Sequence, residues 1–591
     1  MARTMTGAEM VLKALADQGV EHIFGYPGGA ILPIYDEMYQ QDKVKHTLVR
    51  HEQGAVHAAE GYARSTGKVG VVLVTSGPGA TNAVTGLTDA LLDSIPIVCL
   101  TGQVPTHLIG NDAFQECDTV GITRPCTKHN WLVKKIEDLP RVIHEAFHVA
   151  KTGRPGPVVV DIPKDIQFAK GEYVSPSEMD FSKKAYQPRM KGEPSAIERA
   201  VEMLSGAKRP LFYTGGGVIN SGPKAAALLR ELVQLTGFPI TSTLMGLGAF
   251  PAADPLWLGM LGMHGTYEAN WAMHDCDVMV CIGARFDDRI TGKISEFSPG
   301  SKKIHIDIDP SSINKNIRVD LPIVGDVGNI LADMLTVWRK KAPVIDKRAL
   351  KGWWKQIDTW RAKDCLKYKA NKNVIMPQFA VERLYALTKN RDTYITTEVG
   401  QHQMWAAQFY RFEEPNRWMT SGGLGTMGYG LPAAIGVQTA HPGSLVIDIA
   451  GDASILMNIQ EMSTAIQHNL PVKIFILINQ YMGMVRQWQQ LLHGNRLSHS
   501  YTDSLPDFVK LAEAYGGHGI RAEHPGELDD KIMEMIEVKK PVLFDCRVAA
   551  LANCFPMIPS GKAHNDMLLG EDVPDDAAMG RVIGKEGRVM V

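Results

Sequence analysis

The sequence predicts an α/β protein with three doubly wound parallel-sheet domains and a C-terminal tail. Short apolar, β-branched segments recur along the 591 residues and end in loops marked by Gly or Pro. Stretches with helical spacing of apolar residues separate them, an alternation typical of parallel sheets covered by helices. Polar stretches at 172–193 and 341–372 divide the pattern into three blocks. The expected divisions are residues 1–185, 186–350, 351–550 (with 351–373 as a linker) and 551–591 for the tail.

Each block contains several segments with the character of buried strands. In the first block they are HIFGYPG, GVVLVTSGPG, PIVCLTG and PVVVDIP, preceded by a capped amphipathic helix at the N-terminus. The second block has RPLFYTGGG, PITSTLMG, DVMVCIGARFDD and KIHIDID, and the third has TYITTEVG and PVLFDCRV. The charged, Trp-bearing stretch at 341–372 is expected to pack helices on the outside. The tail is expected to be partly mobile or to fold over a site.

Composition restricts the class of protein. With 45% hydrophobic residues, 21% charged residues and a net charge of −2, the chain has no charged surface typical of nucleic-acid or membrane binding. Its 8 cysteines form no C-x-x-C pair, which argues against structural zinc and disulfides and favours a reducing compartment. Neither a signal peptide nor a bilayer-spanning apolar run is visible. We therefore expect a cytoplasmic protein without nucleic-acid or membrane partners.

Residues 445–488 carry the clearest local pattern for a ligand site. One apolar run breaks at Gly451-Asp452, and a second run ends at Asn479. A helix between them, with Ser454 as its expected cap, makes a right-handed crossover and brings both strand ends to one edge of the sheet. A carboxylate and an amide oxygen there suit Mg²⁺, which completes its shell with water and phosphate. An ordinary βαβ unit with a capping Asp and a turn Asn explains the same pattern.

Glu52 is an isolated acid among small and apolar residues, in the segment TLVRHEQGAVHAAEGYAR. A carboxyl group in such a place is desolvated and can share a proton with a ligand nitrogen. The alternative is a helix N-terminal carboxylate stabilised by the macrodipole. Glycine-rich turns at 25–30 and 76–82 allow backbone N–H groups to approach a ligand, although many α/β loops look alike.

Four features together resemble the thiamine-diphosphate enzyme family: His51-Glu52-Gln53-Gly54, Gly451-Asp452-Ala453, Asn479 and Gly425-Thr426-Met427-Gly428. Longer motifs narrow the resemblance to the catalytic subunits of acetohydroxyacid synthase, also called acetolactate synthase, from about residue 5 to 570. These motifs are TGQVPTHLIGNDAFQE (101–116), GRPGPVVVDIPKD (153–165), GARFDDRITG (283–292) and YMGMVRQWQ (481–489). The resemblance implies a pyrimidine-binding domain, a central FAD-binding domain and a diphosphate-binding domain, in that order.

The resemblance implies a transferase of branched-chain amino acid biosynthesis. Pyruvate is decarboxylated on thiamine diphosphate, and its hydroxyethyl unit is joined to a second pyruvate or to 2-ketobutyrate. The products are 2-acetolactate and 2-aceto-2-hydroxybutyrate. Glu52 is implied to bind the pyrimidine nitrogen of the cofactor and favour the imino form that removes the thiazolium C2 proton. Met427 is implied to bend the cofactor, and Mg²⁺ and FAD are the other implied cofactors, although no net redox step occurs.

The implied cofactor contacts fall in all three domains. Mg²⁺ is assigned to Asp452, Asn479 and the backbone carbonyl of Tyr481. Ala453 stands where the family usually has glycine, so this turn has to keep ordinary backbone angles. The implied thiamine diphosphate contacts are Pro27, Gly28, Gly29, Glu52, Thr75, Asn82, Gln115, Val399, Gly400, Gln401, His402, Gly425, Met427, Gly451, Asp452, Ala453, Ser454, Asn479, Tyr481, Met482, Gly483, Met484 and Val485.

The FAD assignment rests on the resemblance. The sequence Gly215-Gly216-Gly217 is no complete G-x-G-x-x-G motif, because Asn220 occupies the third glycine position. The implied FAD contacts are Arg154, Gly215, Gly216, Gly217, Thr243, Leu244, Met245, His264, Gly283, Arg285, Asp288, Arg289, Asp307, Ile308, Asp326 and Val327.

The substrate is implied to contact seven residues, and two of them have alternative explanations. Trp488 suits the extra methyl group of 2-ketobutyrate, but it can also be a packing residue. Arg289 suits the carboxylate of the second substrate, but it can also pair with Asp287 or Asp288. The implied substrate contacts are Gly29, Ala30, Phe114, Gln115, Lys164, Arg289 and Trp488, and the implied catalytic residues are Glu52, Gln115, Lys164 and Met427.

Three other functions fit parts of the sequence. Arg289 and Trp488 argue against an FAD-dependent pyruvate oxidase of the same fold. Glu52 argues against glyoxylate carboligase, which typically has an apolar residue there, and a non-catalytic assembly subunit has no need of Glu52, Asp452 and Asn479 together. The resemblance also implies a homodimer or homotetramer, in which one active site takes Glu52 and Asp452 from different chains. A small regulatory subunit is a further implied partner.

Overall fold

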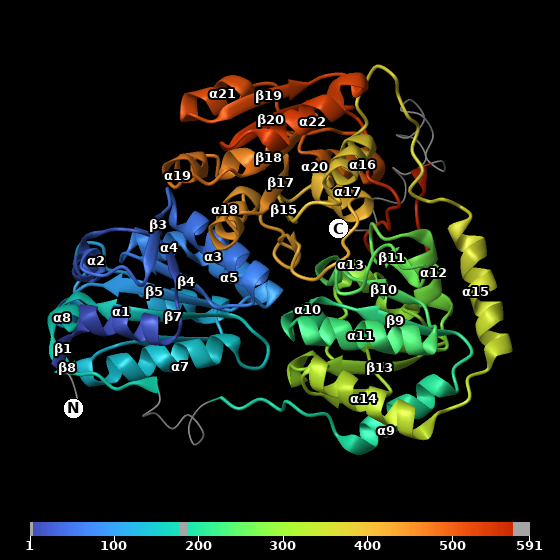
Figure 1. The fold of residues 1–591 in the computed structure, drawn as a ribbon, viewed down its shortest axis with the longest axis horizontal. Coiled ribbons are helices and arrows are strands. Elements are labelled where there is room, and N and C mark those ends of the chain that lie inside the picture. Colours follow the sequence, from blue (N-terminus) through green and yellow to red (C-terminus); the bar gives the residue numbers. More distant parts are fainter. Residues whose placement is uncertain (1–3, 177–185, 571–591) are drawn as a thin grey trace.

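Three six-stranded sheets organise the chain in this computed structural model, which describes residues 4–176 and 186–570. Every strand pair within these three sheets is parallel. The first domain (blue) and the central domain (green) lie side by side, and the third domain (orange) lies across both (Figure 1). The three-domain α/β fold predicted from the sequence is therefore confirmed. No helix of the described residues is long and apolar enough to cross a membrane.

The first sheet is buried on both faces, because alternate residues of its strands enter two different cores. Val71 and Leu73 pack on one face with the helices α1 and α7, whereas Val72 and Val74 pack on the other face with α3 and α5. The strand order is β3-β2-β4-β5-β7-β6. The bounds are α1 Gly7–Asp17, β2 His22–Tyr26, β3 Lys45–Leu48, α3 Glu52–Thr66, β4 Gly70–Val74, α5 Val84–Asp93, β5 Ile97–Gln103, β6 His129–Leu132, α7 Leu139–Lys151, β7 Pro157–Pro163 and α8 Lys164–Phe168.

The N-terminal helix begins as predicted. Thr6 caps α1, since its hydroxyl accepts the Glu9 N–H while the Glu9 carboxylate accepts the Thr6 N–H. This reciprocal arrangement is a capping box, which satisfies two otherwise unpaired N–H groups.

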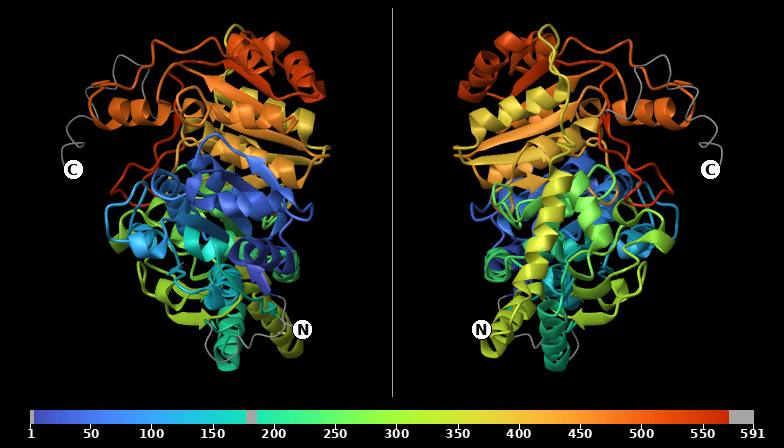
Figure 2. Two further views of the ribbon diagram at one scale, coloured as in Figure 1. Left: turned by 90° about the vertical axis from the view of Figure 1, so that its left-hand side faces the viewer. Right: turned by 90° about the vertical axis from the view of Figure 1, so that its right-hand side faces the viewer.

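The central sheet has the order β11-β10-β9-β12-β13-β14. The predicted outer helix is α15 (Lys347–Arg361), which runs along the outside of the central domain towards the third (Figures 1 and 2). It is anchored by buried Trp353, whose Nε1–H donates to the Pro210 carbonyl at 3.1 Å. The other bounds are α9 Pro194–Ser205, β9 Pro210–Thr214, α10 Gly216–Asn220, α11 Pro223–Thr236, β10 Ile240–Ser242, β11 Trp257–Met260, α12 Tyr267–Asp275, β12 Val278–Ile282, β13 Lys302–Asp307, β14 Leu321–Val324 and α14 Val327–Lys341.

The third sheet has the order β16-β15-β17-β18-β20-β19. Its strand β18 is buried at every position, which matches the continuous apolar run of the sequence. The bounds are α16 Pro377–Thr388, β15 Thr393–Thr397, α17 Gln401–Phe409, β16 Trp418–Met419, α18 Gly430–Ala440, β17 Leu445–Gly451, α19 Glu461–Gln467, β18 Lys473–Ile478, α20 Gly483–Leu492, α21 Phe508–Tyr515, β19 His518–Ala522, α22 Leu528–Glu537 and β20 Val542–Arg547.

Helices α3 and α18 join the first and third domains at very short range. A Cβ atom on Gly61 of α3 would lie 2.1 Å from the Ala433 carbonyl oxygen, and one on Gly436 of α18 would lie 1.8 Å from the Ala58 carbonyl oxygen. The two helices therefore touch backbone to backbone, which only glycine permits.

The expected cap at Ser454 is wrong. Ser454 precedes only a short 3₁₀ turn, Ile455–Met457, and α19 begins later, at Glu461. The Ser454 hydroxyl donates to the Gly451 carbonyl at 3.2 Å instead of accepting a helix N–H. A hydroxyl that turns back onto its own loop competes with capping.

The described part of the tail joins the third and central domains. The Gln487 side chain of α20 donates to the Cys554 carbonyl at 3.0 Å, and the Ile558 N–H donates to the Met263 carbonyl at 2.9 Å. Figure 2 shows this segment (red) running from one domain to the other. Residues 571–591 of the predicted tail, and residues 177–185 of the predicted linker, lie outside the described residues.

Candidate active site

Asp452 and Asn479 lie at the ends of two neighbouring parallel strands, as predicted. Gly451 of β17 pairs with Leu477 of β18, so the loops that follow leave the sheet at one edge. The Asp452 Oδ2 atom accepts the backbone N–H groups of Asn479 (3.0 Å) and Gln480 (2.7 Å), whereas its buried Oδ1 atom has no hydrogen-bond partner. Burial raises the pKa of Asp452 to about 6. One unpaired carboxylate oxygen therefore faces a position that a cation can fill.

Backbone strain in this turn falls on one residue. Gln480 has a φ of +63°, in the left-handed region that non-glycine residues rarely adopt. Ala453 keeps a negative φ, as expected for a residue with a Cβ atom. Strain next to Asp452 is consistent with a loop that is held in shape for binding.

A small cavity of about 60 Å³ opens against the turn. Two glycines allow side chains of α17 to reach this cavity. A Cβ on Gly451 would lie 2.6 Å from His402 Nδ1, and a Cβ on Gly483 would lie 2.1 Å from Gln401 Oε1. Gly483 begins α20, so unpaired helix N–H groups border the cavity, an arrangement suited to anions. The lining residues are Val399, Gly400, Gln401, His402, Trp405, Met427, Gly451, Asp452, Ala453, Ser454, Leu477, Asn479, Tyr481, Met482, Gly483, Met484 and Val485.

A second cavity, of about 570 Å³, joins the central domain to the end of α5 and to the third domain. Its size is within the range of about 300–1,000 Å³ that holds cofactors. Every predicted FAD contact except Asp288 lines it, and Asp288 is 82% exposed at its side chain. The assignment of Asp288 is therefore not supported. The cavity also includes Met427, Met484, Val485 and Trp488, and thus it reaches the small cavity.

The glycine run of the central domain gives this cavity its shape. A Cβ on Gly215 would lie 2.5 Å from the Gly283 carbonyl oxygen, and one on Gly217 would lie 2.7 Å from Gly283 Cα. The ends of β9 and β12 can therefore meet closely below the ligand space. Asn220 also lines the cavity, and its side chain donates to the Ser94 carbonyl at 3.2 Å, so it joins the central domain to the first.

Arg289 and Trp488 lie together at one end of the large cavity. The Arg289 guanidinium lies 6.0 Å from the Trp488 ring centroid, a weak cation–π contact. Arg289 also lies 3.7 Å from Asp288, but this pair is exposed and contributes little to stability. Trp488 packs against Leu491, Leu492 and Met557 while its ring borders the cavity. Both predicted explanations of each residue are therefore compatible with the structure.

Glu52 belongs to a separate group of residues in the first domain. The Asn82 side-chain NH₂ donates to Glu52 Oε2 at 2.9 Å. A Cβ on Gly28 would lie 2.5 Å from Thr75, so these two predicted contacts are neighbours as well. Gln115 adopts a φ of +60°, the strained left-handed conformation. The structure thus brings Asn82 to Glu52, but neither cavity is lined by Glu52, Asn82, Gly28, Thr75 or Gln115.

The predicted substrate contacts of the first domain lie partly at the surface. Phe114 is 88% exposed, which is unusual for a large aromatic residue. Lys164, at the start of α8, is half-buried. Ala30 is buried, and its carbonyl oxygen accepts the Gln167 side chain at 2.8 Å. None of these three predicted contacts lines either cavity, whereas Trp488 lines the large one.

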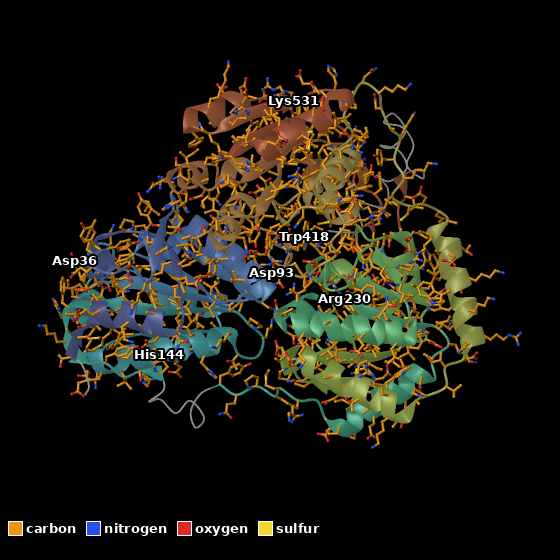
Figure 3. The ribbon with its side chains drawn as sticks, viewed as in Figure 1. Asp36, Asp93, His144, Arg230, Trp418 and Lys531 are labelled. Carbon is orange, nitrogen blue, oxygen red and sulfur yellow. The ribbon has the colours of Figure 1, made fainter. Side chains whose placement is uncertain are left out.

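The loop that carries Met427 is held by two carboxylates that the sequence reasoning missed, the half-buried Asp93 and the fully buried Glu398. Asp93, at the end of α5, accepts the Gly422 and Gly423 N–H groups at 2.9 and 2.7 Å, and it lies where the three domains meet (Figure 3). Glu398 accepts the Gly428 N–H at 2.6 Å on the other side of Met427. Acids isolated in apolar or small-residue segments were the available signal, the same one that singled out Glu52.

Another buried group links α3 and α5. Among the described residues, one cluster of His, Cys, Asp or Glu side chains could offer three ligand atoms to a metal ion, and it consists of His57, Glu60 and Asp89. His57 Nδ1 lies 3.0 Å from Glu60 Oε1, and Asp89 Oδ1 accepts the Thr426 hydroxyl at 3.1 Å. Burial raises the pKa of both acids and lowers that of His57 to about 4. Burial therefore favours the neutral form of all three groups, so the cluster needs no cation to balance its charge.

Comparison with known proteins identifies the family. Residues 5–122, 197–334 and 398–546 match three domain families in order. These are described as thiamine pyrophosphate enzyme, N-terminal TPP binding domain, central domain and C-terminal TPP binding domain.

Similar proteins match over nearly the whole chain. The acetolactate synthase isozyme 3 large subunit of Escherichia coli (strain K12) is 51% identical over 572 residues, 96% of this chain and 99% of that protein. The acetolactate synthase large subunit of Haemophilus influenzae is 50% identical over 570 residues (96% and 99%), and that of Pyropia yezoensis is 46% identical over 567 residues (95% and 95%). Identity of this extent, with all three domains in order, shows that the chain belongs to the acetolactate synthase large subunits, within the thiamine pyrophosphate enzymes.

Proposed function

We propose that the chain is the catalytic subunit of an acetohydroxyacid synthase. It releases CO₂ from pyruvate and joins the remaining two-carbon unit to the keto carbon of a second 2-keto acid. Pyruvate as the second acid gives 2-acetolactate, and 2-ketobutyrate gives 2-aceto-2-hydroxybutyrate, both early in valine, leucine and isoleucine biosynthesis. The observation that carries the proposal is the unpaired Oδ1 atom of Asp452, in a cavity that Met427 also lines and that continues towards Trp488.

The residues fit the three cofactors of this proposal. Asp452 and Asn479 offer hard oxygen ligands to Mg²⁺, and the start of α20 offers N–H groups to a diphosphate. The large cavity has the volume and the glycine-shaped floor for FAD. Bound thiamine diphosphate supplies the electron sink for decarboxylation of a 2-keto acid.

The protein residues supply orientation and proton control. Asn82 donates to one oxygen of Glu52 and thereby aims the carboxyl group, which gives and takes a proton at the pyrimidine nitrogen. Met427 stands on a loop held on both sides by carboxylates, those of Asp93 and Glu398, so it can act as a rigid apolar wedge. Trp488 and Arg289 contact the second 2-keto acid through its alkyl group and its carboxylate.

The active site is completed by a second copy of the chain. This arrangement accounts for two features: neither cavity is lined by Glu52, and Phe114 is almost fully exposed within one chain. A homodimer, or a tetramer made of two such dimers, places Glu52 and Asn82 of one protomer opposite Asp452 of its partner. The small regulatory subunit and the cytoplasmic location stay predictions.

Product analysis tests the proposed function. Purified protein is given thiamine diphosphate, Mg²⁺ and FAD, with pyruvate alone or with added 2-ketobutyrate. The expected products are 2-acetolactate and 2-aceto-2-hydroxybutyrate, without consumption of O₂. Acetate or acetyl phosphate formed with O₂ uptake identifies a pyruvate oxidase instead, and an absence of any turnover of pyruvate contradicts the proposal.

A further inference from the structure

Helix α19 of the third domain holds the backbone that leads into Glu52. Glu461, its first residue, is fully buried. The Glu461 Oε1 atom accepts the backbone N–H groups of Arg50 and His51, both at 3.0 Å, and Oε2 accepts the Thr464 hydroxyl at 2.6 Å. A single carboxylate thus binds the two peptide N–H groups that immediately precede Glu52, the first residue of α3.

Two neighbours of Glu461 extend this contact along the same segment. The Leu48 N–H donates to His468 Nε2 at 3.0 Å, and burial lowers the pKa of His468, so the neutral ring can accept. The Arg50 guanidinium donates to the side-chain oxygen of Gln467. The strand end before Glu52 is therefore attached to the third domain through both its backbone and its side chains.

Gly54 provides independent support, because it leaves the space that Glu461 occupies. A Cβ atom on Gly54 would lie 2.6 Å from Glu461 Oε1 and 2.9 Å from its Cδ, and all three nearest atoms belong to Glu461. Gly54 lies inside α3 with no positive φ, so its backbone does not require glycine. Glycine inside a helix costs stability relative to alanine. The approach of Glu461 explains why glycine is present here.

We propose that Glu461 is a positioning residue for Glu52, and that Gly54 is the space which this contact needs. The inference rests on the proposed role of Glu52 at the cofactor. A catalytic group has to be held in place before the reaction, since a shift of about 1 Å can cost up to about 100-fold in rate. Glu461 belongs to the same strand–helix unit as Asp452, so the third domain of each chain sets the position of that chain's own Glu52.

A double-mutant cycle on the cofactor-loaded protein tests this inference. The variants are Gly54→Ala, Glu461→Ala and the double variant. The readout is the rate at which bound thiamine diphosphate exchanges its thiazolium C2 hydrogen for deuterium, measured by acid quench and proton NMR. We expect each single variant to slow exchange by about 10-fold. The affinity for thiamine diphosphate with Mg²⁺ should change by less than about threefold, because Asp452 and α20 are untouched.

The double variant gives the decisive comparison. The three atoms nearest to a Cβ at position 54 all belong to the Glu461 side chain, so Gly54→Ala should slow exchange by less than about twofold once Glu461 is alanine. In Glu461→Gln, which keeps an acceptor oxygen and the original volume, exchange should stay within about threefold of the wild type, and Gly54→Ala should remain harmful there. Should Glu461→Ala fail to fold, the Glu461→Gln pair still tests the inference, because a Gly54→Ala change that is harmless in the Glu461→Gln background would contradict the close approach at position 54.

Gly352→Ala is the matched control. Gly352 lies in α15, remote from Glu52, and a Cβ atom there meets nothing within 4 Å, so exchange and cofactor affinity should be unchanged. Wild-type exchange in Gly54→Ala, or effects that multiply in the double variant, would overturn the inference. Glu52→Gln serves as the reference: if that variant also exchanges normally, the role of Glu52 fails, which is a separate result from a failure of Glu461 alone.

Discussion

The two halves of the proposed active site differ in how they are made. In the third domain, Asp452 and Asn479 meet through one strand–helix–strand unit, and a cavity already lies against them. In the first domain, Glu52 depends on contacts from distant parts of the chain, with Asn82 on one side and Glu461 on the other. Neither of the two cavities described above is lined by Glu52. The diphosphate half is therefore a local product of the chain, whereas the pyrimidine half depends on another domain and, in the proposed dimer, on a second copy of the chain.

The largest expected effect comes from a change of Glu52, in the half of the site that the first domain provides. Glu52→Gln keeps the size of the side chain but removes its proton exchange, so turnover should fall by about 10²–10⁴-fold. Binding of Mg²⁺ and of the diphosphate should be almost unchanged, since those contacts lie in the third domain. Steady-state rates and cofactor titration by fluorescence measure the two effects. Near-normal turnover in this variant would contradict the proposed mechanism.

Asp452→Asn tests the half of the site that the third domain provides. The variant removes the charge of the unpaired oxygen, so affinity for Mg²⁺ should fall by at least the ~10–100-fold that is typical of changes around metal ligands. Thiamine diphosphate should then bind weakly, and added Mg²⁺ should restore part of the activity. Titration of metal-free protein with Mg²⁺ measures this affinity. An unchanged Mg²⁺ requirement would place the metal elsewhere.

Trp488→Leu tests the end of the large cavity where Trp488 lies beside Arg289. Loss of the flat indole should reduce the preference for 2-ketobutyrate over pyruvate by about 10-fold, the effect of one methyl-sized contact. The ratio of the two products in a competition experiment reports this preference directly. Arg289→Lys is a useful companion, because it keeps the charge but removes the planar fork, and should raise KM for the second acid. An undiminished preference in Trp488→Leu would leave that residue with a packing role only.

The smallest expected effect is a change in the pH dependence of stability, caused by Glu461 at the contact between the third and first domains. Burial raises the pKa of Glu461 to about 7, above its usual value of 4.5. The folded protein therefore binds an extra proton between about pH 4.5 and 7, and this contribution to stability is lost as pH rises through that window. Glu461→Gln has no such ionisable group, so this loss is absent. The free energy of unfolding of the variant, relative to that of the wild type, should therefore rise by ~1–2 kcal/mol from pH 5 to pH 8. Denaturant unfolding at the two pH values measures it, and an equal difference at both would contradict the buried, ionisable Glu461.

Sequence alone predicted the features that depend on local pattern. The alternation of strands and helices predicted the three sheets, and the crossover rule placed Asp452 beside Asn479. The features that were missed depend on residues distant in sequence: Glu461 against Arg50, and Asp93 against Gly422. The wrong cap at Ser454 has a local cause, because one hydroxyl can either cap a helix or turn back onto its own loop, and the sequence does not distinguish these.

If the two half-sites of one chain serve different active sites, two variants that are each defective in one half-site should complement each other in mixed dimers. Glu52→Gln and Asp452→Asn are each impaired alone, but a mixed dimer contains one site with both native residues. After unfolding and random reassembly of equal amounts, under conditions in which wild-type activity is recovered, activity should return to about a quarter of the wild-type value, since half of the dimers are mixed and each has one intact site. A mixture that stays as inactive as its components would contradict this arrangement and place Glu52 and Asp452 of one chain in the same site.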